Sequence, residues 1–272
     1  MPHYYTPKDR ITLERYCCTD EYNQYLYGYL IKSLRGIPFQ VKNETLTLPS
    51  ATQKNEAGLT EITLIGIRKV MGWYRRMIPD RWNEVVFVGS YLNLIDQARL
   101  QLSLGQFPCR IAPRVVIRES PVDLEMRRAL KLSEGKNQFE KLLDELIPIN
   151  IFRACVEGYS EMNQISCAAF PKRPRVIYTA NAQYGDEAFK FWAASHVEHG
   201  VKLLIGQHGG NYGAALWSSQ ENHESRISDM YVSWGWKRES CSNISPLPSG
   251  QLSYASKQIR PDPSGSILLI IT

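Results

Sequence analysis

Hydrophobic side chains recur at helical spacing near the start of the chain. From Pro7 to about Leu34, leucine and tyrosine residues repeat every three or four positions, and Gly36 and Pro38 then supply a stop. The polar stretch 41–59 predicts a loop, and 61–77 predicts a second helix that ends near two arginines. We therefore expect residues 1–82 to form a mainly helical N-terminal region.

Strand patterns begin in the middle of the chain. Residues 84–89 form an apolar, β-branched run that predicts the first strand, and residues 110–117 predict a weaker second one. Residues 121–132 and 137–159 have helical periodicity, and Pro148 is expected to break the second of these helices.

Strand and helix patterns alternate clearly from Arg175 onward. The pattern predicts strands at 175–179, 202–205 and 230–233, and helices at 186–198 and 219–227, with Gly200 ending the first of these helices. Strands that alternate with helices predict a mostly parallel sheet covered by helices. We therefore expect an α/β fold, with a Rossmann-like domain over residues 83–239.

The composition changes after this domain. Residues 240–265 are rich in serine, proline and glycine, which is typical of a linker. Residues 266–272 then form an apolar run with the pattern of a buried strand, which we interpret as the first strand of a truncated second α/β domain. The alternative is that this run adds a last strand to the first sheet.

Charge and cysteine content narrow the class of protein. The net charge of +5 is mild and spread along the chain, so a nucleic-acid-binding arm is not expected, although anionic substrates or an anionic membrane surface are compatible with it. The six cysteines have neither zinc-site nor disulfide spacing, which favours free thiols. The sequence shows no signal peptide and no membrane-spanning run, so we expect a cytoplasmic protein.

The strongest candidate for chemistry is a glycine-rich segment directly after the strand 202–205. Loops that follow the carboxyl ends of parallel strands face the ligand-binding edge of the sheet. Glycines allow positive φ and close approach of a phosphate or sugar, and an imidazole can act as a base or donate to a phosphate. The predicted catalytic residue is His208, and the predicted substrate-binding residues are Gly206, Gln207, Gly209, Gly210, Asn211, Tyr212 and Gly213.

This segment also has a purely structural interpretation. It matches neither a P-loop nor a dinucleotide fingerprint, so it could be a glycine turn whose histidine only packs or caps. Asn181, after the preceding strand, lies on the same edge and is a further predicted binding residue. Asp186 and Glu187 could orient His208 or serve as the base, but acidic residues at a helix start are also explained by the helix dipole alone.

Two neighbouring segments are weaker candidates. The polar helix after the glycine segment could line the same site, although solvated helix surface is the simpler interpretation for its residues Gln220, Glu221, His223 and Glu224. Trp234 and Trp236 could stack on a sugar, but aromatic residues at a strand end more often pack in a core or interface.

Several segments of the chain together carry a resemblance to a known family. They are Tyr178–Asn181, Asp186 and Glu187, Phe189–Ala194, Ile205–Gly213, Ile227–Tyr231 and Ser233–Trp236. With these segments the chain resembles a family of bacterial transferases assigned to surface carbohydrate biosynthesis. The resemblance is specific over about 175–236 and weaker in two upstream segments, 4–10 and 80–82. Members of that family are longer, so both ends of this chain are expected to be truncated.

The resemblance implies a GT-B-like glycosyltransferase that acts on lipopolysaccharide or capsule. Two Rossmann-like domains would face a cleft, the C-terminal domain would hold a nucleotide-sugar donor, and the acceptor would be a polysaccharide or a lipid-linked glycan. We expect no metal or separate cofactor, no nucleic-acid partner, and a cytoplasmic location that includes the inner face of the inner membrane. The alternatives are an alditol-phosphate transferase of the teichoic-acid type and a truncated, non-catalytic carbohydrate-binding scaffold.

Overall fold

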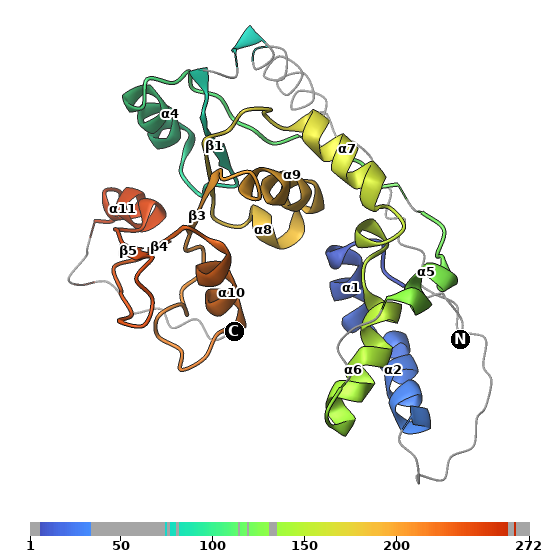
Figure 1. Cartoon of the computed structure of the whole chain (residues 1–272). Coiled ribbons are helices and arrows are strands. Elements are labelled where there is room, and N and C mark those ends of the chain that lie inside the picture. The colour runs from blue at the N-terminus through green and yellow to red at the C-terminus, as the bar shows by residue number, and fades with distance from the viewer. Residues whose placement is uncertain are drawn as a thin grey trace. The chain divides into compact units, whose positions relative to one another are not determined.

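The described strands form one five-stranded parallel sheet (Figure 1). The computed structural model describes residues 6–33, 74, 77–79, 82–113, 115–118, 120–130, 135–260 and 264. The strands follow one another in chain order across the sheet, and every neighbouring pair is parallel. The described strands are β1 (Val85–Val88), β2 (Val176–Thr179), β3 (Lys202–Gly206), β4 (Met230–Ser233) and β5 (Ile244–Pro246).

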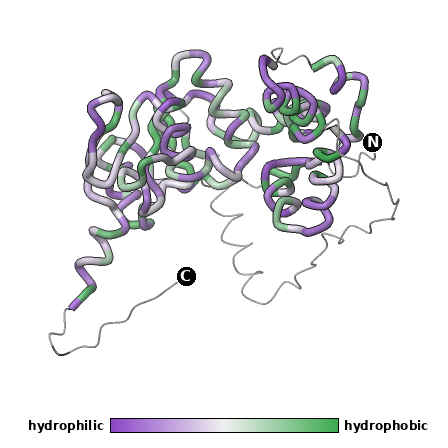
Figure 2. Tube along the Cα trace, turned by 90° about the horizontal axis from the view of Figure 1, so that it is seen from below, coloured by the Kyte–Doolittle hydropathy of each residue, from purple (hydrophilic) through white to green (hydrophobic). Residues whose placement is uncertain are grey.

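Helices separate most of the strands along the chain, as the alternating pattern predicts. The described helices are α1 (Arg10–Cys17), α2 (Asp20–Ser33), α4 (Leu94–Ser103), α5 (Leu124–Ala129), α6 (Gln138–Asn150), the 3-10 helix η3 (Arg153–Cys155), α7 (Tyr159–Ala169), α8 (Ala182–Gly185), α9 (Glu187–Val197), α10 (Ser219–Ile227) and α11 (Gly250–Ser256). Hydrophobic and hydrophilic stretches alternate along their turns (Figure 2). The predicted Rossmann-like α/β fold with a parallel sheet and flanking helices is confirmed.

The described chain divides into two compact units. Unit 1 takes in the described parts of 1–73, 113–172 and 183–195, and unit 2 those of 74–112, 173–182 and 196–272. Unit 1 is helical, and its core includes Phe170, which stacks on Trp192 with ring centroids 4.9 Å apart. A buried ion pair joins Arg127 to Glu157 at 2.6 Å in the same unit.

Unit 2 contains the sheet and its apolar centre. Ile177, Ile205 and Tyr231 are completely buried on three adjacent strands. The register pairs Val88 with Thr179 and Thr179 with Ile205, so the carboxyl ends of these strands lie at one edge. The loops after β1, β2, β3 and β4 therefore leave the sheet at this edge, which we call the carboxyl edge.

Several predicted elements differ from those observed. The described residues of 110–117 form no strand, since Pro113 lacks the amide N–H that a sheet ladder needs. The break predicted near Pro148 in the helix over 137–159 is confirmed, since α6 ends at Asn150 and α7 begins separately at Tyr159. The stretch 240–265, for which composition predicts a linker, contains β5 paired with β4 and the helix α11. The three residues of β5, which ends at Pro246, are too few for a periodicity to be visible in the sequence.

Some predictions lie outside the described residues. These are the loop at 41–59, nearly all of the helix at 61–77, and the strand at 266–272. The six cysteines are free thiols, as their spacing predicts. Among the described helices, none combines the length and apolar composition required to cross a membrane.

Candidate functional site

The carboxyl edge of unit 2 brings the loops after β1, β2 and β3 together around His208. This residue follows β3, and its ring lies beside Tyr91 from the loop after β1, with centroids 6.2 Å apart. The side chain of His208 is 18% exposed, so the ring is sheltered but accessible to solvent. The imidazole therefore lies at the carboxyl edge, and in open parallel sheets ligands bind beyond this edge.

Polar groups of the polar helix α10 and of the glycine segment lie against the imidazole. Nδ1 of His208 is 3.5 Å from Oε1 of Glu224, and the Tyr212 hydroxyl is 3.4 Å from Nε2. The same hydroxyl donates to Glu224 over 3.3 Å. These contacts are long for hydrogen bonds, which is common at sites that tighten only when a substrate binds.

The protonation state of His208 follows from its surroundings. Burial lowers the pKa of the imidazole below its usual value, and a hydrogen bond with the Ala180 backbone opposes this shift without cancelling it. The ring is therefore neutral at pH 7, which is the form that can accept a proton. With a neutral ring, the contact to Glu224 is a polar contact that becomes an ion pair when the imidazole is protonated.

Glu224 is a stronger functional candidate in the structure than its place on a polar helix indicates. It is completely buried, although its helix is polar. The hydroxyl of Tyr231 also faces it: burial first, and the nearby Glu224 charge second, raise the pKa of this phenol. The Tyr231 phenol therefore stays protonated beside the carboxylate, and the Tyr212 hydroxyl donates to it.

The interpretation of α10 as solvated surface is wrong for two of its four named residues. Glu221 and Glu224 are buried, whereas Gln220 and His223 are exposed. Glu221 accepts from the amide of Gly213 at 2.7 Å and pairs with Arg238 at 2.7 Å. The spacing of three residues between the two glutamates, which places them on one helix face, is the signal in the sequence that could have identified them.

Gln207 holds the glycine segment against the loop after β4. Its buried side-chain carbonyl accepts from the Trp234 amide and from the Trp236 indole, each at 2.8 Å. Its own amide group donates to the Gly209 carbonyl at 2.6 Å. Gln207 thus fixes the loop that carries His208, and the two tryptophans contribute to this connection.

The glycines of the segment serve mainly close packing. A Cβ on Gly213, where φ is +76°, would lie 2.6 Å from the Trp236 ring, and a Cβ on Gly206 would collide with the Tyr178 phenol. At Gly210 a Cβ would meet open space. Gly213 is the glycine of this segment that has positive φ. Gly210 and Asn211 are exposed.

Asn181 belongs to the same edge as His208. Its side-chain amide donates to the Tyr91 hydroxyl at 2.9 Å. Asp186 and Glu187 instead belong to unit 1. Asp186 caps α9 by accepting from the Phe189 amide at 2.9 Å, as the helix-dipole interpretation predicts.

Glu187 has structural partners within unit 1. Its carboxylate pairs with Lys190 at 2.7 Å and accepts from the Arg10 amide at 3.3 Å. Burial raises the pKa of the Asp186 carboxyl beside it. These contacts account for both acidic residues as parts of a helix start.

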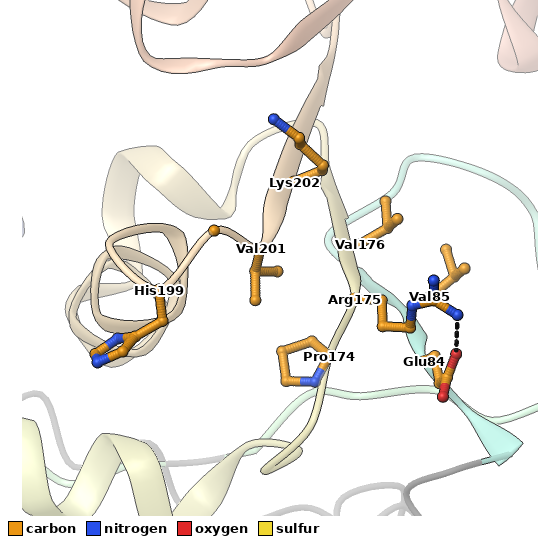
Figure 3. A pocket seen from close by; sticks show the side chains of 9 residues that line it. Glu84, Val85, Pro174, Arg175, Val176, His199, Val201 and Lys202 are labelled. Atoms are coloured by element: carbon orange, nitrogen blue, oxygen red, sulfur yellow. Dashed lines mark hydrogen bonds and ion pairs between the residues drawn. The ribbon is translucent and has the colours of Figure 1, made fainter.

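An open cavity of about 480 Å³ lies at the opposite, amino edge of the sheet (Figure 3). Arg175 and Lys202 line it, but each is already paired with a carboxylate, Glu84 at 3.2 Å and Asp229 at 2.7 Å. In open parallel sheets ligands bind beyond the carboxyl ends, so the imidazole group of His208 is the better candidate. The described residues contain no group of three potential metal ligands.

The fold and this edge define a Rossmann-like α/β protein with a histidine and a buried carboxylate where such sheets bind their ligands. The chain belongs to the LIC12162 family of transferases, whose model matches residues 3–272. No curated protein and no solved structure matches the chain.

Proposed function

We propose that this chain catalyses glycosyl transfer from a nucleotide-activated sugar to a hydroxyl of a surface polysaccharide or a lipid-linked glycan. The observation that supports it most directly is the neutral, accessible imidazole of His208 backed by the buried Glu224. Membership of a transferase family is consistent with this proposal. A GT-B arrangement, in which a second α/β domain holds the donor, and a location at the inner face of the membrane are parts of the same proposal.

In the proposed reaction His208 is the general base. Its imidazole takes the proton of the acceptor hydroxyl while the hydroxyl oxygen forms a bond to the anomeric carbon of the donor. The bond from that carbon to the phosphate oxygen of the nucleotide breaks, and the nucleotide leaves with the bonding electrons. The imidazolium formed in this step faces the Glu224 carboxylate, which favours it electrostatically.

The test compares His208→Ala with wild type in the full-length protein. Transfer is measured with a panel of UDP-, GDP-, dTDP- and CMP-sugars, using membranes of the source cell as acceptor and product masses as the readout. The substitution should reduce transfer by about a hundredfold or more if His208 is the base. His223→Ala, which removes an exposed imidazole from α10, is the matched control and should leave transfer unchanged.

Two outcomes would contradict the proposal. A loss of less than about threefold in His208→Ala would exclude the histidine as general base. Product masses that require an alditol phosphate, obtained with CDP-glycerol or CDP-ribitol and with none of the sugar donors, would show that the transferred group is not a sugar.

A further inference from the structure

Tyr91 combines an unusual backbone conformation with an exposed ring. Its φ is 56°, which makes it the one non-glycine residue with positive φ in the described part of the chain. A side chain in the left-handed region is strained, and such strain is often found at ligand-binding sites. The residue is 40% exposed, so burial of its ring does not account for the strain.

The ring of Tyr91 is held in a defined position beside the imidazole. Its hydroxyl accepts from the Asn181 amide at 2.9 Å, and its centroid lies 6.2 Å from that of His208, with a tilt of 46° between the rings. Gly89 makes room for this arrangement, because a Cβ there would lie 2.6 Å from the Asn181 side-chain oxygen. The loop after β1 and the loop after β2 thus present one face of an aromatic ring at the carboxyl edge.

We infer that Tyr91 is the stacking platform for a sugar ring of the acceptor, with Asn181 fixing the platform and His208 facing the sugar hydroxyl. An aromatic ring with a polar group beside it suits a sugar, which has apolar C–H faces and a hydroxyl rim. The inference rests on the proposed function, since it assigns the acceptor to the site where His208 would act as base.

The charges around His208 favour a neutral sugar over a diphosphate. Glu224 lies against the imidazole. Arg238 pairs with Glu221, the other buried glutamate of α10, so the charge of this arginine is already neutralised. A diphosphate placed here would be repelled by a buried carboxylate. The platform is therefore assigned to the acceptor sugar and not to the donor nucleotide.

The experiment measures binding directly, so it does not depend on transfer activity. Glucose, galactose, mannose and N-acetylglucosamine are titrated separately into the full chain, and the ring signals of tyrosine and histidine are followed by NMR, with UDP as the comparison ligand. We expect at least one sugar to bind wild type, with an affinity reduced at least tenfold in Tyr91→Gly. Tyr91→Phe, which keeps the ring, should retain most of the binding.

The variants separate loss of the platform from loss of the fold. Glycine and asparagine both tolerate positive φ, so Tyr91→Gly and Tyr91→Asn should melt cooperatively while both lose the sugar. Equal sugar binding in wild type and Tyr91→Gly, or no binding of any tested sugar by wild type, would overturn the inference. So would a loss of UDP binding in Tyr91→Gly with sugar binding unchanged, because the ring would then stack on a nucleobase. Normal transfer in His208→Ala would instead refute the proposed function and leave these binding results unaffected.

Discussion

Replacing Glu224 by Gln tests whether the buried carboxylate supports the imidazole. The substitution keeps the shape of the side chain and removes its charge at a position with no solvent exposure. Tyr212, whose hydroxyl donates to Oε1 at 3.3 Å, can donate equally well to the amide oxygen. The protein should therefore fold, with a free energy of unfolding changed by no more than the net contribution of one neutral hydrogen bond, about 1 kcal/mol.

The effect on catalysis follows from the distance between the two groups. The carboxylate lies 3.5 Å from Nδ1, so it interacts strongly only with the protonated ring. A hydrogen bond to a charged group contributes about 2 kcal/mol. Loss of that amount from the imidazolium of the proposed reaction corresponds to about a 30-fold reduction in kcat/KM. The pKa of His208, already lowered by burial, should fall further in the variant.

The assay combines kinetics with an NMR titration of the histidine. Transfer by Glu224→Gln is compared with wild type and with Glu198→Gln, which removes an exposed charge beside the amino-edge residue His199. Glu224→Asp, which keeps the charge, should recover part of the lost activity. If Glu224→Gln keeps kcat/KM within about threefold of wild type, and the pKa of His208 does not change, the carboxylate neither orients the imidazole nor stabilises its protonated form.

Three further predictions concern pH and backbone conformation. Because burial lowers the pKa of His208, kcat/KM should stay high below the usual histidine pKa, which a pH profile of transfer measures. The stability contributed by the neutral ring is fully present above the unfolded-state pKa and should be lost as pH falls through the folded pKa, which a pH profile of unfolding measures. Gly213→Ala should destabilise the protein by about 1 to 3 kcal/mol in urea unfolding, since φ is +76° and the new Cβ meets Trp236, whereas an unchanged midpoint would mean that the ring moves freely. Tyr91→Gly should raise the unfolding free energy by about 1 kcal/mol because it relieves positive φ, and a lower melting temperature would contradict the assignment of strain.

The sequence predicts the sheet well where the strands are buried and followed by helices. The strand predicted at 230–233 and the helix predicted at 219–227 have the observed limits of β4 and α10. Apolar runs between turn residues leave few alternatives, because a parallel strand must be covered and its neighbour must follow a crossover. β5 could not be predicted, since its three residues gain their structure by pairing with β4 and not from a pattern of their own.

The candidate site was predictable only in part. Position after a strand was enough to identify His208, because all loops at that edge share one location. Tyr91 was not identified, and Glu224 was named only as a weaker candidate, because neither side chain is unusual in the sequence: one is a loop tyrosine, and the other lies on a polar helix. Only the three-dimensional structure shows that the first has positive φ and that the second is completely buried.

The contacts of the glycine segment bear on how its composition should be interpreted. Four glycines in eight residues suggest a cradle for phosphate, but Gly206 and Gly213 are explained by the aromatic rings of Tyr178 and Trp236 that press against them. A phosphate cradle also needs a surrounding positive potential, whereas the charge next to the imidazole is the Glu224 carboxylate. The close packing instead fixes the path of the loop, and a fixed loop holds the imidazole at a constant distance from its carboxylate. This rigidity is what a general base requires, because its rate advantage depends on constant geometry toward the hydroxyl it deprotonates.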